Sequence, residues 1–178
     1  ERSYTPAMAS TKPAMPTKDG YNFGGWFTDK EGTTAYDFTK PVRMSMTLYA
    51  KWTPNANTPY KVKHYKQTTA LGSNYELADT DNLTGTTGTN TNAQAKSYTG
   101  FTNKTFSQKT ILGDGTTVVD IYYDRNEFAL TFDTHGAQTI KPKVIYYGAP
   151  VGELPIPSKD GFEFGGWYTQ PEGAGTLV

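Results

Sequence analysis

The chain has 178 residues, and its 17 Lys and Arg residues balance its 17 Asp and Glu residues, so the formal net charge is zero at pH 7. A neutral chain has no bulk attraction to nucleic acid, and no apolar stretch approaches the roughly 20 residues that a membrane-spanning helix needs. The absence of cysteine excludes disulfides, thiolate metal sites and cysteine nucleophiles.

The first predicted element is a strand that carries Gly24, Gly25 and Trp26 and follows an Asp-Gly turn signal. The Gly pair inside this strand predicts a β-bulge or a close approach of another backbone. A buried aromatic side chain hides about 150–250 Å² of surface, so we expect Trp26 to cap a small core. A small unit without disulfides needs such an anchor.

The next elements are predicted by alternation of apolar and polar residues. Residues 47–52 alternate cleanly, which predicts a strand with Trp52 on its apolar face. Residues 60–65 and 117–123 predict the opening and closing strands of a middle segment. Residues 79–92 lie between them, are rich in Thr, Asn and Gly and have no apolar face, so we expect an exposed and mobile loop there.

An internal repeat links the two ends of the chain. Residues 18–28 recur as residues 159–169, with eight of the 11 positions identical and an offset of 141 residues. The second copy therefore places Gly165, Gly166 and Trp167 in the structural positions of the first Gly-Gly-Trp motif. We expect the two Trp side chains to occupy equivalent, largely buried positions in superimposable strands.

The offset is about twice 70 residues, so the chain divides into three predicted units: 1–54, 55–125 and 126–178. A strand is predicted over residues 128–133, near the start of the third unit. The first unit lacks a counterpart of this strand, and the third unit lacks a counterpart of the strand at 47–52. Either the terminal units borrow a strand from a neighbouring molecule or are only partly ordered, or the segment comes from a longer protein with complete repeats.

The motifs of the terminal units resemble a known family. Residues 19–26, followed by Tyr36-Asp37-Phe38 and residues 48–52, are similar to the Listeria–Bacteroides repeat, the B repeat of internalin-type surface proteins. Residues 1–54 resemble the later part of that repeat, and residues 128–173 resemble its earlier part.

The middle unit resembles a different repeat, that of mucin-binding-protein-like (MucBP-like) modules. The resemblance rests on residues 60–65, 83–88, 98–101 and 121–123. Together the two resemblances imply a mainly β or α+β chain of tandem β-grasp-like units joined by short linkers. They also imply extracellular exposure on the cell surface or cell wall of a Gram-positive bacterium, and a role in adhesion or as a stalk.

The residues themselves assemble no catalytic, metal or cofactor site, so we expect a protein that is not an enzyme and needs no cofactor. His64 and His135 have no second His at ligand spacing, so both are interpreted as structural. Asp79 and Asp81 resemble the start of a calcium loop, but Leu83 occupies the next ligand position and excludes that interpretation.

The excess of Tyr, 13 residues, gives the one hint of a ligand. Tyr65 and Tyr122 are expected opposite or beside core residues of their strands, where they could stack on a sugar or anchor a protein. Alternatively, they cover half-buried sheet faces. The leading hypothesis is a non-catalytic adhesive stalk or spacer whose partners are neighbouring repeats. The alternative is a module that binds a host glycan or protein through the middle unit, with neither nucleic acid nor membrane insertion involved.

Overall fold

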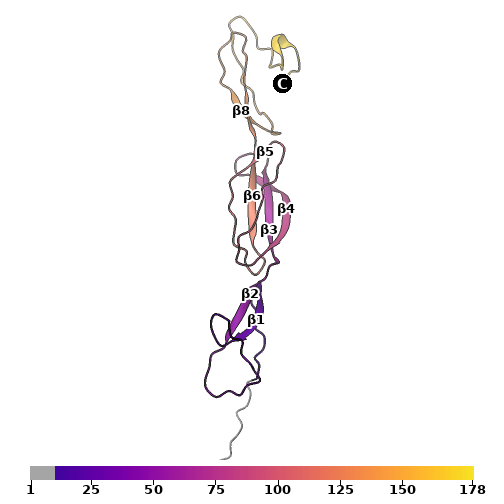
Figure 1. The fold of residues 1–178 in the computed structure, drawn as a ribbon. Coiled ribbons are helices and arrows are strands. Elements are labelled where there is room, and N and C mark those ends of the chain that lie inside the picture. The colour runs from indigo at the N-terminus through magenta and orange to yellow at the C-terminus, as the bar shows by residue number, and fades with distance from the viewer. Residues whose placement is uncertain (1–10) are drawn as a thin grey trace, which may run out of the picture. The chain divides into compact units, whose positions relative to one another are not determined.

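The computed structural model describes residues 11–178, and the regular secondary structure of these residues is almost entirely β (Figure 1). Its single helical element in that range is a three-residue 3-10 turn, η1 (Pro171–Gly173). Within residues 11–178, eight strands form one four-stranded and two two-stranded sheets. The predicted β-rich class with little helix is therefore confirmed. The first ten residues of the predicted unit 1–54 lie outside the described residues.

The first sheet pairs β1 (Tyr21–Phe27) with β2 (Tyr49–Pro54) in antiparallel fashion. The register shifts by one residue between Phe23 and Gly25, so Gly24 is the extra residue of a β-bulge. Gly25 has a φ of 118°, which a residue with a side chain adopts only under strain. The bulge predicted from the Gly pair is thus present.

The second sheet has four strands in the order β4-β3-β6-β5: β3 (Thr58–Gln67), β4 (Tyr75–Gly85), β5 (Phe101–Asn103) and β6 (Val118–Arg125). Alternate residues of β3 and β6 are fully buried, which places the main hydrophobic core on one face of this sheet. The buried side chains of these two strands include Tyr60, Val62, His64, Val119, Ile121 and Tyr123. The apolar face predicted for the closing strand is confirmed.

The segment predicted as an exposed, mobile loop over residues 79–92 is mostly exposed, but its first half belongs to a strand, so the prediction of a loop is wrong there. β4 takes in its first half, and two of its Thr residues are buried further along. The hydroxyls of Thr87 and Thr58 lie 2.6 Å apart. Thr91 donates to Gln108 Oε1 at 2.7 Å. These Thr hydroxyls can be buried because each has a hydrogen-bond partner. β4 needs no apolar face because an edge strand pairs through its backbone.

The third sheet pairs β7 (Glu127–Leu130) with β8 (Lys143–Tyr146), also antiparallel. The second Gly-Gly-Trp segment, residues 162–168, is not a strand, and only the isolated bridges Lys159–Phe162 and Tyr168–Leu177 hold its ends. The expectation that both copies form strands is therefore wrong. The first copy has β2 beside it, whereas no strand of residues 11–178 pairs along the second copy.

Contacts between residues divide the chain into two compact units. Among the described residues, the first unit takes in 11–65, Leu77–Ala95 and Thr105–Ile121. The second consists of Lys66–Glu76, Lys96–Lys104 and Tyr122–Val178. The division at residues 54 and 125 that the repeat pattern suggests stays a prediction.

Candidate ligand-contact surface and unit junctions

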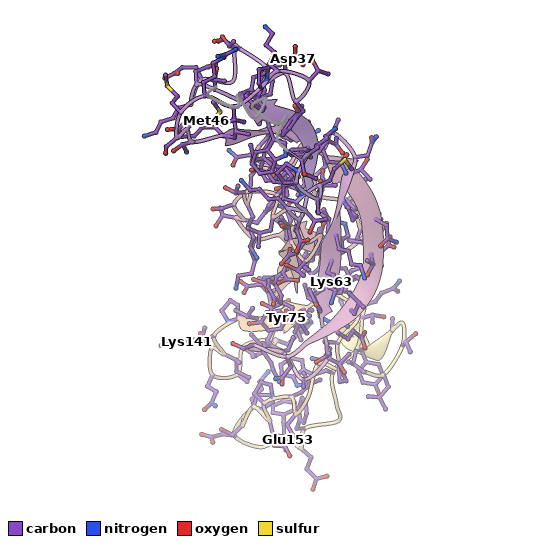
Figure 2. The ribbon with its side chains drawn as sticks, turned by 90° about the horizontal axis from the view of Figure 1, so that it is seen from below. Asp37, Met46, Lys63, Tyr75, Lys141 and Glu153 are labelled. Carbon is purple, nitrogen blue, oxygen red and sulfur yellow. The ribbon has the colours of Figure 1, made fainter. Side chains whose placement is uncertain are left out.

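Two tyrosines of the second compact unit form an aromatic pair on its surface. Tyr75 lies at the start of β4, where Figure 2 labels it, and Tyr122 lies in β6 with 39% of its surface exposed. Their ring centroids are 4.9 Å apart at an interplanar angle of 69°, an edge-to-face arrangement. The pair presents an aromatic edge and face of the kind that stacks against sugars or apolar protein groups.

Charged groups flank this aromatic pair. The Tyr75 hydroxyl donates to Asp124 Oδ1 at 2.5 Å, and Lys104 Nζ lies 3.4 Å from the same hydroxyl and 3.7 Å from Asp124. The hydrogen bond to Asp124 is the main cause that raises the pKa of Tyr75, and the bond to Tyr75 is the main cause that raises the pKa of Lys104. At neutral pH the surface therefore carries a phenol, a carboxylate and an ammonium group side by side.

The predicted contact residue Tyr65 lies in β3, within the first compact unit, and is half-buried. Burial, followed by its interaction with Asp120, raises the pKa of the Tyr65 hydroxyl. Asp120 and Asp124 thus each engage a tyrosine. Sequence reasoning missed Tyr75 and Lys104, because neither lies in a segment with clear alternation.

The two Gly-Gly-Trp segments keep the same local geometry. The φ angles are 118° at Gly25 and 119° at Gly166. The rings of Phe23 and Trp26 are 5.5 Å apart, and those of Phe164 and Trp167 are 5.3 Å apart. Both Trp side chains are half-buried, less than the largely buried positions expected of them. The local conformation is therefore a property of the motif and does not require the paired strand.

The surroundings of the two Trp side chains differ. The Phe23 ring contacts both Trp26 and Trp52, and its centroid lies 5.5 Å from that of Trp52. Trp167 packs 4.8 Å from Phe132, and its indole Nε1 donates to the Pro155 carbonyl at 2.8 Å. The indole Nε1 of Trp26 is buried and has no hydrogen-bond partner in the described part of the chain. Each copy therefore shows contacts that the other lacks.

The connection between β2 and β3 is a hydrogen-bonded junction within the first compact unit. The Asn55 amide donates to the Gly20 carbonyl at 2.8 Å, and the Asn55 carbonyl accepts from the Thr87 amide at 3.0 Å. A Cβ added to Gly113 would overlap the carbonyl oxygen of Asp19. The Asp-Gly turn before β1 thus lies directly against the Gly113 turn.

The connection between β6 and β7 repeats this pattern within the second compact unit. The Asn126 amide donates to the Gly100 carbonyl, and the Asn126 carbonyl accepts from the Tyr147 amide, both at 2.9 Å. Arg125 adds a bond from Nη1 to the Tyr147 carbonyl at 2.7 Å and one from Nε to the Gln67 carbonyl at 3.1 Å. A Cβ on Gly100 would overlap the Tyr147 ring. At each junction, a single Asn is therefore hydrogen-bonded through both its backbone N–H and its backbone carbonyl.

The remaining candidates are structural in character. His64 is fully buried, and its Nε2 lies 3.0 Å from Asp81 Oδ2. Across residues 11–178, no group of three or more His, Asp or Glu side chains could hold a metal ion. Within the same residues, no helix has the length and apolar character to cross a membrane.

Comparison with known proteins points to one repeat family. The sequence model of the Listeria-Bacteroides repeat domain matches residues 1–51 and 128–178, the two segments that carry the Gly-Gly-Trp motifs. The stretch between them, which holds the four-stranded sheet, lies outside that match. No solved structure matches the chain.

Two relatives are similar to most of the chain and a third to part of it. A protein of Evansella cellulosilytica named as a Gly-rich membrane protein is 26% identical over 90% of this chain and 19% of its own length. A second membrane protein of that organism is 25% identical over 88% of this chain and 24% of its own length. Internalin H of Listeria monocytogenes is 48% identical over 26% of this chain and 9% of its own length. The chain thus spans a quarter or less of each relative.

Proposed function

Because this chain belongs to the Listeria-Bacteroides repeat family, we propose that it is a non-catalytic spacer segment of a bacterial surface protein. Family membership and the similarity to internalin H support a surface-associated protein without enzymatic activity. We place it on the outside of a Gram-positive cell wall, where tandem units would hold a binding domain away from the cell. In this proposal its partners are neighbouring repeats, and it requires no cofactor.

The observation that carries the spacer proposal is the construction of the two junctions. Flexible linkers between domains are exposed and rich in Gly, Ser or Pro. Here a single Asn connects the two strands at each junction, and both its backbone N–H and its backbone carbonyl are hydrogen-bonded. In repeat proteins, the total stability is the sum of the stabilities of the units and of the contacts between neighbouring units. Packed junctions therefore suit a spacer that must keep its units in line.

The proposed organisation keeps three units, 1–54, 55–125 and 126–178, each of β-grasp-like type. The small sheets and the repeat match at both ends support this organisation. The middle unit would be of the MucBP-like type, since its four-stranded sheet lies outside the matched repeats.

Limited trypsin digestion tests whether the second junction is closed. Trypsin cleaves after Lys and Arg, and the two Arg sites compared are Arg125 at the junction and Arg43 on an exposed stretch outside any strand. A closed junction protects the bond after Arg125, so we expect cleavage after Arg43 to be at least tenfold faster. Comparable rates at the two sites would contradict the spacer proposal.

A matched pair of variants sharpens this test. Gly100→Ala should open the junction and accelerate cleavage after Arg125, because the new methyl group overlaps the Tyr147 ring. Gly72→Ala is the control: Gly72 has a φ of 59°, also positive, but nothing lies within 4 Å of an added Cβ. If both variants are cleaved like the unaltered chain, the packed junction does not protect Arg125.

The Tyr75–Tyr122 surface favours a second candidate function, binding of a host glycan or protein. Its exposed ring, carboxylate and ammonium group offer stacking together with hydrogen bonds, the combination that suits sugars. A glycan array probed with the whole chain tests this candidate. Binding that Tyr122→Ala abolishes and Tyr147→Ala preserves would support it, and an array without reproducible signal would leave the spacer as the sole function.

A further inference from the structure

The first and last strands of the four-stranded sheet are neighbours and run in the same direction. β3 and β6 lie next to each other in the strand order (Figure 1). Near the start of β3, the Lys61 amide donates to the Thr117 carbonyl at 3.0 Å. At the end of the same strand, Arg125 Nε donates to the Gln67 carbonyl at 3.1 Å. Residue numbers therefore rise together along both strands, which is parallel pairing.

The chain enters this sheet through β3 and leaves it through β6. Asn55 precedes β3 and Asn126 directly follows β6, and both are hydrogen-bonded through their backbone. Because the two strands are parallel, the start of β3 and the end of β6 lie at opposite ends of the strand pair. A pull on the two ends of the chain therefore slides β3 along β6 and does not peel one strand from the other.

Sliding is the direction in which a strand pair resists force most. The hydrogen bonds of a parallel pair are evenly spaced, so a force along the strands stretches all of them at once. A peeling force breaks them one after another. Val62 of β3 and Ile121 of β6 have no exposed surface, so the buried face of the sheet keeps water from replacing these bonds as they stretch.

Side-chain bonds strengthen the far end of the strand pair. The Gln67 side chain is buried, and its Oε1 accepts from the Arg125 amide at 3.1 Å. Its Nε2 donates to the Gly72 carbonyl at 2.8 Å, in the turns that follow β3. Gln67 thus ties the end of β6 to the connection between β3 and β4, at the point where a force transmitted through Asn126 enters the sheet.

We propose that β3 and β6, together with the contact between Gln67 and Arg125, form a mechanical clamp that resists tension along the chain. A spacer that is anchored at one end and holds a bound partner at the other is under such tension. The use of the clamp therefore rests on the spacer role proposed above, whereas the resistance itself is a property of the sheet.

Single-molecule force spectroscopy of the whole chain tests the clamp. The chain has no cysteine, so introduced Cys residues at exposed positions give unique attachment points for the handles. Ala56→Cys with Glu127→Cys applies the sliding force. Ala56→Cys with Thr116→Cys applies a peeling force, because both positions lie at the same end of the strand pair: a Cβ added to Gly115 would lie 3.0 Å from Pro59 Cγ.

At the same pulling rate, we expect the sliding geometry to require at least twice the force of the peeling geometry. Unfolding of residues 58–125 in the sliding geometry should lengthen the tether by about 20 nm, which identifies the event. Urea unfolding of the two double-Cys variants should give the same midpoint, so that a difference in force reports the direction of pulling alone. Equal forces in the two geometries would overturn the proposal.

Gln67→Ala tests the side-chain bonds of the clamp. It should lower the sliding force by about a fifth or more and leave the peeling force unchanged, since peeling begins at the opposite end of the strands. Gln94→Ala is the matched control, because the exposed Gln94 amide bonds only to the nearby Asn92 side chain. Equal loss of both forces in Gln67→Ala would overturn the assignment of Gln67 to the clamp.

The clamp and the spacer role can fail separately. The comparison of pulling directions uses chains with Gln67 in place, so it decides the proposal even if Gln67→Ala does not fold. Trypsin cleavage after Arg125 reports whether the junction is closed and does not depend on the ratio of the two forces. A closed junction with equal forces would leave the spacer without a clamp.

Discussion

The junction at Asn55 can be tested by adding one methyl group. Gly113 does not have a positive φ, so Ala at this position is compatible with the local backbone. The added Cβ would lie 2.6 Å from the Asp19 carbonyl carbon and would overlap the attached oxygen. Backbone atoms cannot rotate away as a side chain can. Gly113→Ala should therefore force the Asp19-Gly20 turn away while the sheets on either side stay folded.

The size of the effect follows from the bonds that the turn makes. Displacing the turn breaks the bond from Asn55 to Gly20, and the adjoining bond from Thr87 to Asn55 becomes exposed to water. Each such bond contributes about 0.5–1.5 kcal/mol net, so the junction should lose about 1–3 kcal/mol. A loss of about 1–3 kcal/mol in the free energy of local opening accelerates amide exchange about 5- to 150-fold where exchange proceeds by that opening.

Hydrogen exchange of the Asn55 and Thr87 amides measures this loss directly. The amides of Val119 and Ile121, in the central sheet, should exchange as in the unaltered chain. Gly165→Ala is the matched control, since Gly165 also lacks a positive φ and has open space around an added Cβ. Unchanged exchange at Asn55 in Gly113→Ala would show that the contact between the two turns does not hold the junction.

Two further predictions concern the core and a turn. Ile121→Ala should lower the free energy of unfolding by about 2–5 kcal/mol, because the side chain is fully buried; a loss below about 1 kcal/mol in urea unfolding would contradict the core position. The hydrogen bond from the Thr33 amide is the main cause that lowers the pKa of Asp29 below its usual 3.8. The Asp29 carboxylate therefore stabilises the turn fully above pH 3.8, and the turn loses that stabilisation as the pH falls through the lowered pKa of Asp29. The NMR chemical shift of the Thr33 amide should follow this titration, and in Asp29→Asn it should not change over the same pH range.

Strict alternation predicted the core strand well. Val119, Ile121 and Tyr123 occupy every second position of β6, and each is at most 1% exposed. The bulge was predictable for a similar reason, since two adjacent glycines inside an otherwise apolar strand have few other uses. Both features are encoded by a few residues close together in sequence, so each can be recognised without knowledge of its partner strand.

The errors arose where structure depends on a distant segment. β4 has polar side chains on both faces and is held by its neighbour β3, so no local pattern distinguishes it from a loop. Residues 162–168 closely match the sequence of β1 but form no strand, because no strand of residues 11–178 pairs along them. The sequence predicts the candidate surface only in part: Tyr122 lies on an alternating strand, whereas Tyr75 reaches the surface through the fold alone.

The contact between Gly20 and Gly113 also constrains how such a chain can change over generations. A Cβ on either glycine would collide with the backbone of the other turn, so a mutation at one position cannot be accepted unless the other turn moves. Two segments that lie far apart in the sequence are therefore inherited as a matched pair. Recombination that replaced one segment and kept the other would separate them. Duplication that copied both together would produce a working junction in a single step.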